Sequence, residues 1–519
     1  MSRDLVVSIF TALKELGVEE IALCPGSRNA YFVQYLSKEH GFNVSTWYEE
    51  RSAAFYALGT IKRSGKPAAI ITTSGTAAAE LLPATMEAHY LGLPLLLITA
   101  DRPRRFRLSG APQCAEQVGL YTYYTRFAED IAWGEDSTLH KNWKKDGPAH
   151  LNVCMEDPRG QTEAPTTKEP VWAKYHNPGG IEKLEEFLDK ANYPLVIASG
   201  LSSSEVEPVT RFLLKLGAPV YLEGTSRLRE STELAHLSLR IIEGIWKRAS
   251  DNGYPIDAVL RIGGVPTLRP WRDLDDKEGA IGVFSVSSQP FPGLHWGDCL
   301  TMPLQNLHKV KVQSKNSVTM TCWLGSDKPL LLKREDLYYK YPSAEPSLVH
   351  HLSKHIPKEA LVYLGNSLPI REWDLSASYT HPHAEVAANR GVNGIDGQLS
   401  TFFGMCEPRQ PCWGIFGDLT TLYDMAAPWI LQQKKDLTPI CVVINNGGGM
   451  IFSRMYPEKA FLNNHSLRFN PLAELWRMEY HLWNKIPEQL PKNWGKQPTI
   501  VEIIPDDTQT KSFWEQYCQ

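Results

Sequence analysis

Hydrophobic runs alternate with amphipathic segments along the first third of the chain. Apolar residues recur at helical spacing over 4–17, which predicts an amphipathic helix. Two further helices and three apolar strands are expected in this third: helices 50–63 and 77–90, and strands 21–23, 68–73 and 93–100. Apolar strands that alternate with helices are typical of a parallel sheet covered on both faces.

The same alternation continues through the rest of the chain. Seven more strands are predicted: 194–198, 219–222, 258–262 and 281–286 in the middle third, and 361–364, 412–416 and 439–444 in the last third. A Pro-, Thr-, Glu- and Lys-rich stretch at 155–185 and a polar, charged stretch at 323–345 are interpreted as linkers. The sequence therefore predicts three doubly wound α/β domains, over residues 1–175, 176–340 and 341–519.

Length and composition agree with this organisation. A chain of 519 residues is too long for one hydrophobic core, and 43% apolar with 22% charged residues is typical of a soluble globular protein. Lys and Arg number 54 against 58 Asp and Glu, so no nucleic-acid partner is expected. No apolar run reaches the ~18 residues that would predict a membrane span. The nine scattered cysteines include no Cys-x-x-Cys pair, and no signal peptide is recognised, so we expect reduced thiols and a cytoplasmic location.

Two glycine patterns look superficially like phosphate-binding loops. Residues 59–66 read Gly-x5-Gly-Lys, but the spacing is wrong for a P-loop and Pro67 replaces the hydroxyl residue that would hold magnesium. Residues 391–397 read Gly-x-x-Gly-x-x-Gly and lack the opening Gly-x-Gly of a dinucleotide fingerprint. A nucleotide-binding module therefore has little support.

Oxygen-bearing side chains follow two strands of the last third. The strand at 412–416 runs into Gly417 and Asp418, and the strand at 439–444 runs into Asn446, which precedes three glycines. The carboxyl ends of parallel strands share one edge of a sheet, where ligands bind. One carboxylate, one amide and a backbone carbonyl suit a magnesium ion that carries a diphosphate. Each motif alone is typical of an ordinary strand-to-helix turn, whereas the pair at this spacing favours a metal site.

This pair resembles the metal–diphosphate motif of the thiamine-diphosphate enzymes. Three other segments resemble parts of that family: 49–59 its catalytic-glutamate helix, 73–77 its cofactor loop, and 147–153 the end of its pyrimidine-binding domain. Within the family, the chain is most similar to the menaquinone-pathway synthases that join 2-oxoglutarate to isochorismate. The matching segments are Cys-Pro-Gly-Ser-Arg at 24–28, Thr-Ala-Asp-Arg-Pro at 99–103, 365–368 with Arg371, 389–391, 394–397, 399–401 and 451–453.

The resemblance implies that thiamine diphosphate binds with Mg²⁺ or Mn²⁺ between a pyrimidine-binding first domain and a diphosphate-binding third domain. Asp418, Asn446 and the Gly448 carbonyl would hold the metal. Glu50 would be the activating acid, because a dry pocket raises a carboxyl pKa and lets the group share a proton with the cofactor ring. The remaining cofactor contacts would come from Pro25, Thr73, Ile395, Leu419, Thr420, Gly449, Met450 and Ile451.

Arginines suit the implied substrates, because each substrate carries two carboxylates and a guanidinium group binds a carboxylate through two parallel hydrogen bonds. By resemblance, Ser367, Arg371 and Arg390 would bind the part derived from 2-oxoglutarate and take part in catalysis. The isochorismate side would be formed by Ser27, Arg28, Arg102, Gln113 and Arg269, with Ile451, Phe452 and Met455 as an apolar wall. The implied reaction is the decarboxylation of 2-oxoglutarate, followed by 1,4-addition of a succinyl-semialdehyde carbanion to isochorismate.

Two departures from the family pattern fall on the isochorismate side. Pro112 replaces a usual Asn and has neither a side-chain amide nor a backbone N–H. Arg269 stands where the family has a lysine. A related carboligase with another acceptor therefore stays open, as does, more weakly, a non-catalytic scaffold. The resemblance also implies a homodimer or a dimer of dimers, because the cofactor would lie between domains of two subunits.

Overall fold

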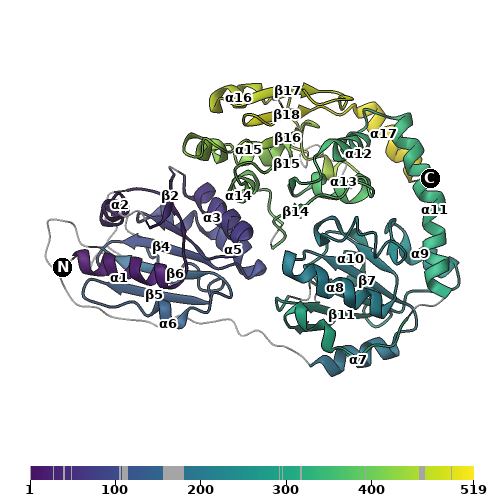
Figure 1. Cartoon of the computed structure of the whole chain (residues 1–519), viewed down its shortest axis with the longest axis horizontal. Helices are drawn as coiled ribbons and strands as arrows, with labels where there is room; N and C mark the ends of the chain where they lie inside the picture. Colours follow the sequence, from purple (N-terminus) through teal and green to yellow (C-terminus); the bar gives the residue numbers. More distant parts are fainter. Residues whose placement is uncertain are drawn as a thin grey trace.

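In the computed structural model, the chain forms three α/β domains, each built on a six-stranded sheet whose neighbouring strands are parallel (Figure 1). The structure describes residues 2–26, 28–38, 41–47, 49–104, 107, 115–155, 180–291, 293–294, 296–315, 318–391, 393–454, 462–491 and 494–518. The predicted fold class is confirmed. The predicted boundary at 175 lies outside these residues, and the boundary at 340 stays a prediction.

The first domain has the strand order β2-β1-β3-β4-β6-β5. Its elements are α1 (Ser2–Glu15), β1 (Glu20–Leu23), α2 (Ala30–Leu36), β2 (Asn43–Thr46), α3 (Glu50–Ser64), β3 (Ala68–Thr72), α4 (Thr76–Ala79), α5 (Leu82–Leu91), β4 (Leu95–Asp101), β5 (Phe127–Ala132), α6 (Leu139–Asn142) and β6 (Ala149–Cys154). One apolar cluster lies on each face of the sheet. Helices α1, α2 and α6 cover one face, and α3 and α5 cover the other.

Predicted strands 21–23, 68–73 and 93–100 are confirmed as β1, β3 and β4. The single helix predicted over 77–90 is wrong, because the structure has α4 and α5 there with a break at 80–81. Pro83 lies in the first turn of α5 and has no N–H to donate back to α4. The helix therefore stops and restarts at this point.

The middle domain has the strand order β12-β11-β10-β7-β8-β9. Its elements are α7 (Ile181–Lys190), β7 (Pro194–Ser199), α8 (Ser203–Leu216), β8 (Val220–Leu222), η2 (Gly224–Ser226), β9 (Ser238–Leu239), α9 (Ile245–Asp251), β10 (Ala258–Gly263), α10 (Arg269–Arg272), η3 (Asp273–Lys277), β11 (Gly282–Ser287), β12 (Asp298–Thr301) and η4 (Leu304–Lys309). All four strands predicted in this third are confirmed.

The third domain has the strand order β14-β13-β15-β16-β18-β17. Its elements are α12 (Glu345–His355), β13 (Leu361–Leu364), α13 (Leu368–Ser376), β14 (Glu385–Ala387), α14 (Gln398–Met405), β15 (Cys412–Gly417), α15 (Asp418–Tyr423), η5 (Ala427–Gln432), β16 (Ile440–Ile444), η6 (Met450–Phe452), α16 (Asn470–Trp476), β17 (Glu479–Trp483), β18 (Thr499–Ile503) and α17 (Asp507–Tyr517). The three strands predicted here are confirmed as β13, β15 and β16.

The polar stretch interpreted as a linker at 323–345 is largely helical. Helix α11 (Val318–Lys340) runs along the outer edge of the molecule from the middle domain to the third domain, beside α17 (Figure 1). Tertiary contacts at both ends account for this helix: Trp323 is buried in the middle domain, and Tyr338 stacks on Phe513 of α17. None of the described helices combines the length and apolar character needed to cross a bilayer.

The first and third domains share one apolar core. Helix α3 packs on α14, and residues of both helices belong to the same buried cluster. Two glycines allow this close approach, because a Cβ atom on Gly59 would lie 2.1 Å from the Thr401 carbonyl oxygen, and one on Gly404 would lie 2.2 Å from the Tyr56 carbonyl oxygen. The crossing holds the beginning of α3, and with it Glu50, against the third domain.

Candidate active site

The third sheet changes its winding direction between β13 and β15. The chain passes from β13 to β14 on one side and then returns to place β15 on the other side. Helices leaving in opposite directions open a crevice at the carboxyl ends of these strands. The structure places a cavity of about 320 Å³ at this edge.

The cavity brings together most of the residues predicted for the cofactor, the metal and 2-oxoglutarate. They follow four different strands, and only the sheet topology makes them neighbours. The predicted residues that line it are Ser367, Arg371, Arg390, Ile395, Asp418, Leu419, Thr420, Asn446, Gly448, Gly449, Met450 and Ile451.

Asp418 begins helix α15 and is 2% exposed. Its Oδ2 accepts hydrogen bonds from the N–H groups of Gly447 and Gly448, both at 2.9 Å, and its Oδ1 accepts one from Leu419 at 2.6 Å. Burial raises the pKa of the Asp418 carboxyl, while these N–H donors and His465 oppose the rise. A divalent cation at this point would favour the ionised carboxylate.

The two asparagines after β16 have different surroundings. Asn445 is buried and donates from its amide to the Leu467 carbonyl at 2.9 Å and to Glu502 at 2.7 Å. Asn446 donates from Nδ2 to both oxygens of Glu345, at 3.0 and 3.2 Å. Its Oδ1 is buried and has no hydrogen-bond partner among the described residues. Buried polar atoms are normally paired. The unpaired Asn446 oxygen, in the same cavity as the Asp418 carboxylate, therefore fits a hard cation such as Mg²⁺.

The glycine loop after Asn446 brings backbone atoms close to the same point. Gly448 has φ +146°, and a Cβ atom there would lie 2.4 Å from the Leu462 carbonyl oxygen. Only glycine therefore suits this position. Asp418, Asn446 and the Gly448 backbone together form an oxygen-donor set that fits a divalent metal.

Ser367 and Arg371 lie at opposite ends of the first turn of α13. Ser367 has φ +75°, a conformation that costs a non-glycine residue roughly 1–3 kcal/mol and is often found at functional sites. Arg371 donates from Nη1 to the Ser367 carbonyl oxygen at 2.5 Å. The strained turn and the guanidinium group are thus fixed to each other at the cavity wall.

Arg390 follows β14 and is 9% exposed. Its Nη1 donates to Asn366 Oδ1 at 2.6 Å, and the Asn366 amide donates to the carbonyls of Asn389 and Gly394 at 2.8 and 2.7 Å. Burial lowers the pKa of the Arg390 guanidinium from its ordinary value, but arginine remains charged at neutral pH. Asn366 therefore fixes the position of the buried Arg390 guanidinium group at the cavity.

Three residues predicted to bind the cofactor follow adjacent strands of the first sheet: Pro25 after β1, Glu50 after β2 and Thr73 after β3. Glu50 begins α3, and burial raises its pKa. Its neighbour Glu49 is the N-cap and accepts two backbone N–H groups of the first turn. The Thr73 hydroxyl is buried without a hydrogen-bond partner in the described structure. None of these residues lines the 320 Å³ cavity, so one chain presents the predicted site in two parts.

The residues predicted for isochorismate are less well gathered. Arg28 and Arg102 are half-buried after β1 and β4, and Arg28 donates to the Met155 carbonyl at 3.0 Å. Arg269 begins α10 in the middle domain, with its side chain 78% exposed and 3.7 Å from Asp273. Ser27, Pro112, Gln113, Met455 and the side chain of Phe452 lie outside the described residues.

The sequence interpretation missed three polar residues that line the cavity, Glu345, Asn393 and Asn463, and it missed His465, which lies beside Asp418. His465 Nε2 lies 3.3 Å from Asp418 Oδ2. Nothing in the spacing of these residues marks them as site residues. Pro346 is a helix-start signal directly after Glu345, but a helix start does not reveal that the carboxylate meets Asn446.

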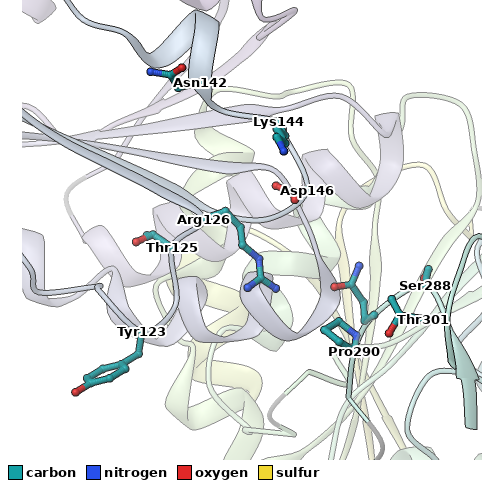
Figure 2. A pocket seen from close by; sticks show the side chains of 10 residues that line it. Tyr123, Thr125, Arg126, Asn142, Lys144, Asp146, Ser288, Pro290 and Thr301 are labelled. Atoms are coloured by element: carbon teal, nitrogen blue, oxygen red, sulfur yellow. The ribbon is translucent and has the colours of Figure 1, made fainter. Parts of the chain in front are cut away.

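A larger cavity of about 440 Å³ lies between the first and middle domains (Figure 2). Arg126 extends into it from the first domain, and Pro290 and Thr301 line it from the middle domain (Figure 2). No residue predicted for cofactor or substrate lines this cavity. Despite its larger size, this cavity therefore has no role in the chemistry described above.

Comparisons with known proteins decide the family. Residues 3–120 match the family described as thiamine pyrophosphate enzyme, N-terminal TPP binding domain. A 2-succinyl-5-enolpyruvyl-6-hydroxy-3-cyclohexene-1-carboxylate synthase from Bdellovibrio bacteriovorus is 40% identical, over 99% of this chain and 98% of that protein. The chain belongs to this synthase family. A protein of the same name from Akkermansia muciniphila is 36% identical, over 96% of this chain and 95% of that protein.

Two solved structures of other proteins share the fold of this chain. A putative thiamin diphosphate-dependent enzyme from Mycobacterium smegmatis matches with a TM-score of 0.71 at 16% identity, over 96% of this chain and 99% of that one. Benzoylformate decarboxylase from Polynucleobacter necessarius matches with the same TM-score and identity, over 96% and 98%. At this identity the likeness concerns the three-domain fold alone.

Proposed function

We propose that this chain decarboxylates 2-oxoglutarate with thiamine diphosphate and adds the remaining four-carbon unit to isochorismate by 1,4-addition. The product would be 2-succinyl-5-enolpyruvyl-6-hydroxy-3-cyclohexene-1-carboxylate, the compound in the names of the two synthases above. One observation carries the proposal: the oxygen set of Asp418 and Asn446 shares its cavity with two arginines, Arg371 and Arg390.

The metal half of the site would be built by the third domain. Asp418, Asn446 and the Gly448 carbonyl would hold Mg²⁺ or Mn²⁺, and Thr420 with residues 449–451 would surround the diphosphate. When bound, thiamine diphosphate supplies a thiazolium ring that takes up the electron pair released when carbon dioxide leaves. Ile395 would support the cofactor from the cavity wall.

Glu50 would hold and exchange the activating proton. Its carboxyl group is half-buried at the start of α3, and burial raises its pKa, so the proton is held more firmly than by an exposed glutamate. A carboxyl with a raised pKa can pass a proton to and from a ring nitrogen at neutral pH. Pro25 and Thr73, at the ends of the two neighbouring strands, would flank the same ring.

Arg371 and Arg390 would bind the carboxylates of 2-oxoglutarate. Both remain charged at any working pH, and their guanidinium groups are already oriented by the Ser367 carbonyl and by Asn366. A pre-oriented guanidinium group loses little side-chain entropy when it pairs with a carboxylate. Ser367, in its strained turn, would contact the same substrate.

We further propose a homodimer in which the first domain of one subunit completes the cavity of the other. Pro25, Glu50 and Thr73 do not line the cavity of their own chain, and symmetric dimers are the commonest assemblies that could bring them to the cavity of a second subunit. A dimer of dimers would repeat the same pairing. The cytoplasmic location stays a prediction.

A mixed-dimer experiment tests this arrangement. Glu50→Gln and Asp418→Ala chains, each inactive alone, are co-expressed with different tags and assayed as a mixture. If the site is shared between subunits, half of the random dimers carry one intact site, and activity returns to about a quarter of the wild-type value. If both residues act within one chain, every site carries a lesion and the mixture stays inactive.

The acceptor is tested directly. Wild-type protein is supplied with Mg²⁺, thiamine diphosphate and 2-oxoglutarate, and carbon dioxide release is followed with and without isochorismate. We expect isochorismate to be consumed in step with carbon dioxide release. Release of carbon dioxide with isochorismate untouched would favour another acceptor, which Pro112 and the exposed Arg269 motivate.

A further inference from the structure

Two buried glutamates lie behind the metal ligands, and the proposed mechanism gives them no role. Glu345 begins α12, Glu372 lies on α13, and the two side chains are 4% and 3% exposed. Burial raises the pKa of both carboxyl groups, and the charge of Glu345 raises that of Glu372 further, so the two groups lie close to each other.

Glu345 accepts hydrogen bonds from Asn446, one of the proposed metal ligands. Both of its oxygens accept from Asn446 Nδ2, at 3.0 and 3.2 Å. An asparagine side chain has an oxygen end and an NH₂ end, which a rotation exchanges. Because both Glu345 oxygens face the NH₂ end, the oxygen end of the amide is turned away from Glu345. The Asn446 oxygen is the buried atom that has no partner in the described structure.

The backbone fixes Glu345 independently of Asn446. Its N–H donates to the Thr510 hydroxyl at 3.0 Å, and Pro346 sets the first turn of α12. Glu372 comes from the helix that also carries Arg371. The orientation of the Asn446 amide is therefore imposed by a residue whose own position is fixed by the start of α12.

We propose that Glu345 is a positioning residue that keeps the carbonyl oxygen of the Asn446 amide turned toward the metal. The inference rests on the proposed metal site of Asp418, Asn446 and Gly448. An amide turned the other way would present its NH₂ group to a cation and could not ligate it. Groups that orient metal ligands typically contribute 10–100-fold to metal affinity.

The experiment measures metal affinity rather than turnover. Mn²⁺ is titrated into full-length protein with thiamine diphosphate present, and free Mn²⁺ is counted by electron paramagnetic resonance. Glu345→Ala removes the acceptor, and we expect the Mn²⁺ dissociation constant to rise about 10–100-fold. Glu345→Gln keeps a carbonyl oxygen facing Asn446 Nδ2, and we expect an affinity within about threefold of wild type.

A second variant guards against misfolding. The pair Glu345→Met and Glu372→Leu replaces the buried carboxyls by apolar side chains of similar size, a change that is often neutral or stabilising. Thermal unfolding of the metal-free protein tests whether this variant is folded. We expect it to bind Mn²⁺ as weakly as Glu345→Ala, because it lacks the acceptor for the amide.

Asn446→Ala separates this inference from the proposed site. If Asn446→Ala weakens Mn²⁺ binding but the folded double variant binds like wild type, the positioning role is wrong and the metal site stands. If Asn446→Ala itself binds Mn²⁺ normally, the metal site is wrong and the positioning role fails with it. Loss in Glu345→Ala that Glu345→Gln does not recover would show that the carboxyl acts otherwise than as an acceptor for Asn446.

Discussion

Replacing Gly59 by alanine tests whether the crossing of α3 and α14 positions Glu50. A Cβ atom at this point would lie 2.1 Å from the Thr401 carbonyl oxygen and 2.9 Å from the Gly404 Cα atom. Ordinary contacts of a Cβ atom begin at about 3.4 Å. The opposing atoms belong to the backbone and cannot rotate away, so the helices must separate by about 1 Å.

Two opposing effects set the magnitude for Gly59→Ala. Alanine is favoured over glycine within a helix by about 1 kcal/mol. Overpacking a core costs about 1–3 kcal/mol, and a contact between backbones lies at the upper end of that range. The net loss is about 1–2 kcal/mol, which corresponds to a fall of roughly 2–8 °C in melting temperature. Because Glu50 begins the displaced helix, a shift of about 1 Å should also lower kcat by up to 100-fold.

Gly325→Ala is the matched control. Gly325 is an exposed residue of α11, and nothing lies within 4 Å of the Cβ position. The same substitution should therefore stabilise the protein by up to about 1 kcal/mol and leave kcat unchanged. Both variants are measured by scanning calorimetry and by steady-state kinetics. A Gly59→Ala protein that melts as high as wild type with full activity would refute the role of the crossing.

Three further outcomes are expected. Glu50→Gln should lower kcat by about 10²–10⁴-fold, while thiamine diphosphate affinity measured by titration calorimetry stays within about threefold. Arg371→Lys should raise KM for 2-oxoglutarate by about tenfold, because the charge stays but the planar fork is lost; an unchanged KM would remove Arg371 from substrate binding. Asp424 is buried, and burial raises its pKa to about 6 from 3.8, so the folded state holds a proton that the unfolded state releases. Stability from this group is fully present below about pH 4 and falls as pH rises to about 6, and Asp424→Asn should flatten the pH dependence of the unfolding free energy, measured by denaturant titration, by on the order of 1–3 kcal/mol in that window.

Most interior strands were predictable because their residues are apolar without interruption, whereas the interior strands β6 and β18 contain polar residues and were not predicted. Segments such as 68–73 and 412–416 lie in the middle of their sheets and are buried on both faces. The edge strands β2, β14 and β17 were not recognised, since each has a partly exposed face and a mixed sequence. Helix α11 was missed for a related reason: packing at Trp323 and Tyr338 outweighs the helix-breaking Gly325 and Pro329.

The site was predictable where its residues directly follow strands. Asp418 and Asn446 stand at strand ends, so parallel pairing of β15 with β16 was enough to bring them together. Glu345 and His465 reach the same point from a helix start and from a loop, and no local pattern announces such long-range contacts. The glycine pattern at 59–66, rejected as a phosphate loop, instead contains the glycine of the helix crossing. The reason for that glycine lies 340 residues away, on α14, where sequence spacing carries no signal.

The middle domain helps to position helix α13, which carries Arg371. The described residues of that domain do not themselves line the 320 Å³ cavity. Arg371 lies at the cavity, and the next residue, Glu372, lies close to Glu345 beside the proposed metal site. Asp374 points to the middle domain, where it accepts from the Tyr221 hydroxyl at 2.6 Å and from the Gly224 N–H at 2.8 Å. One helix is therefore fixed at once by the substrate side, the metal side and the middle domain. A hydrogen bond of this kind stabilises by about 0.5–1.5 kcal/mol, so the middle domain restrains the helix that carries Arg371 without contributing a described side chain to the cavity.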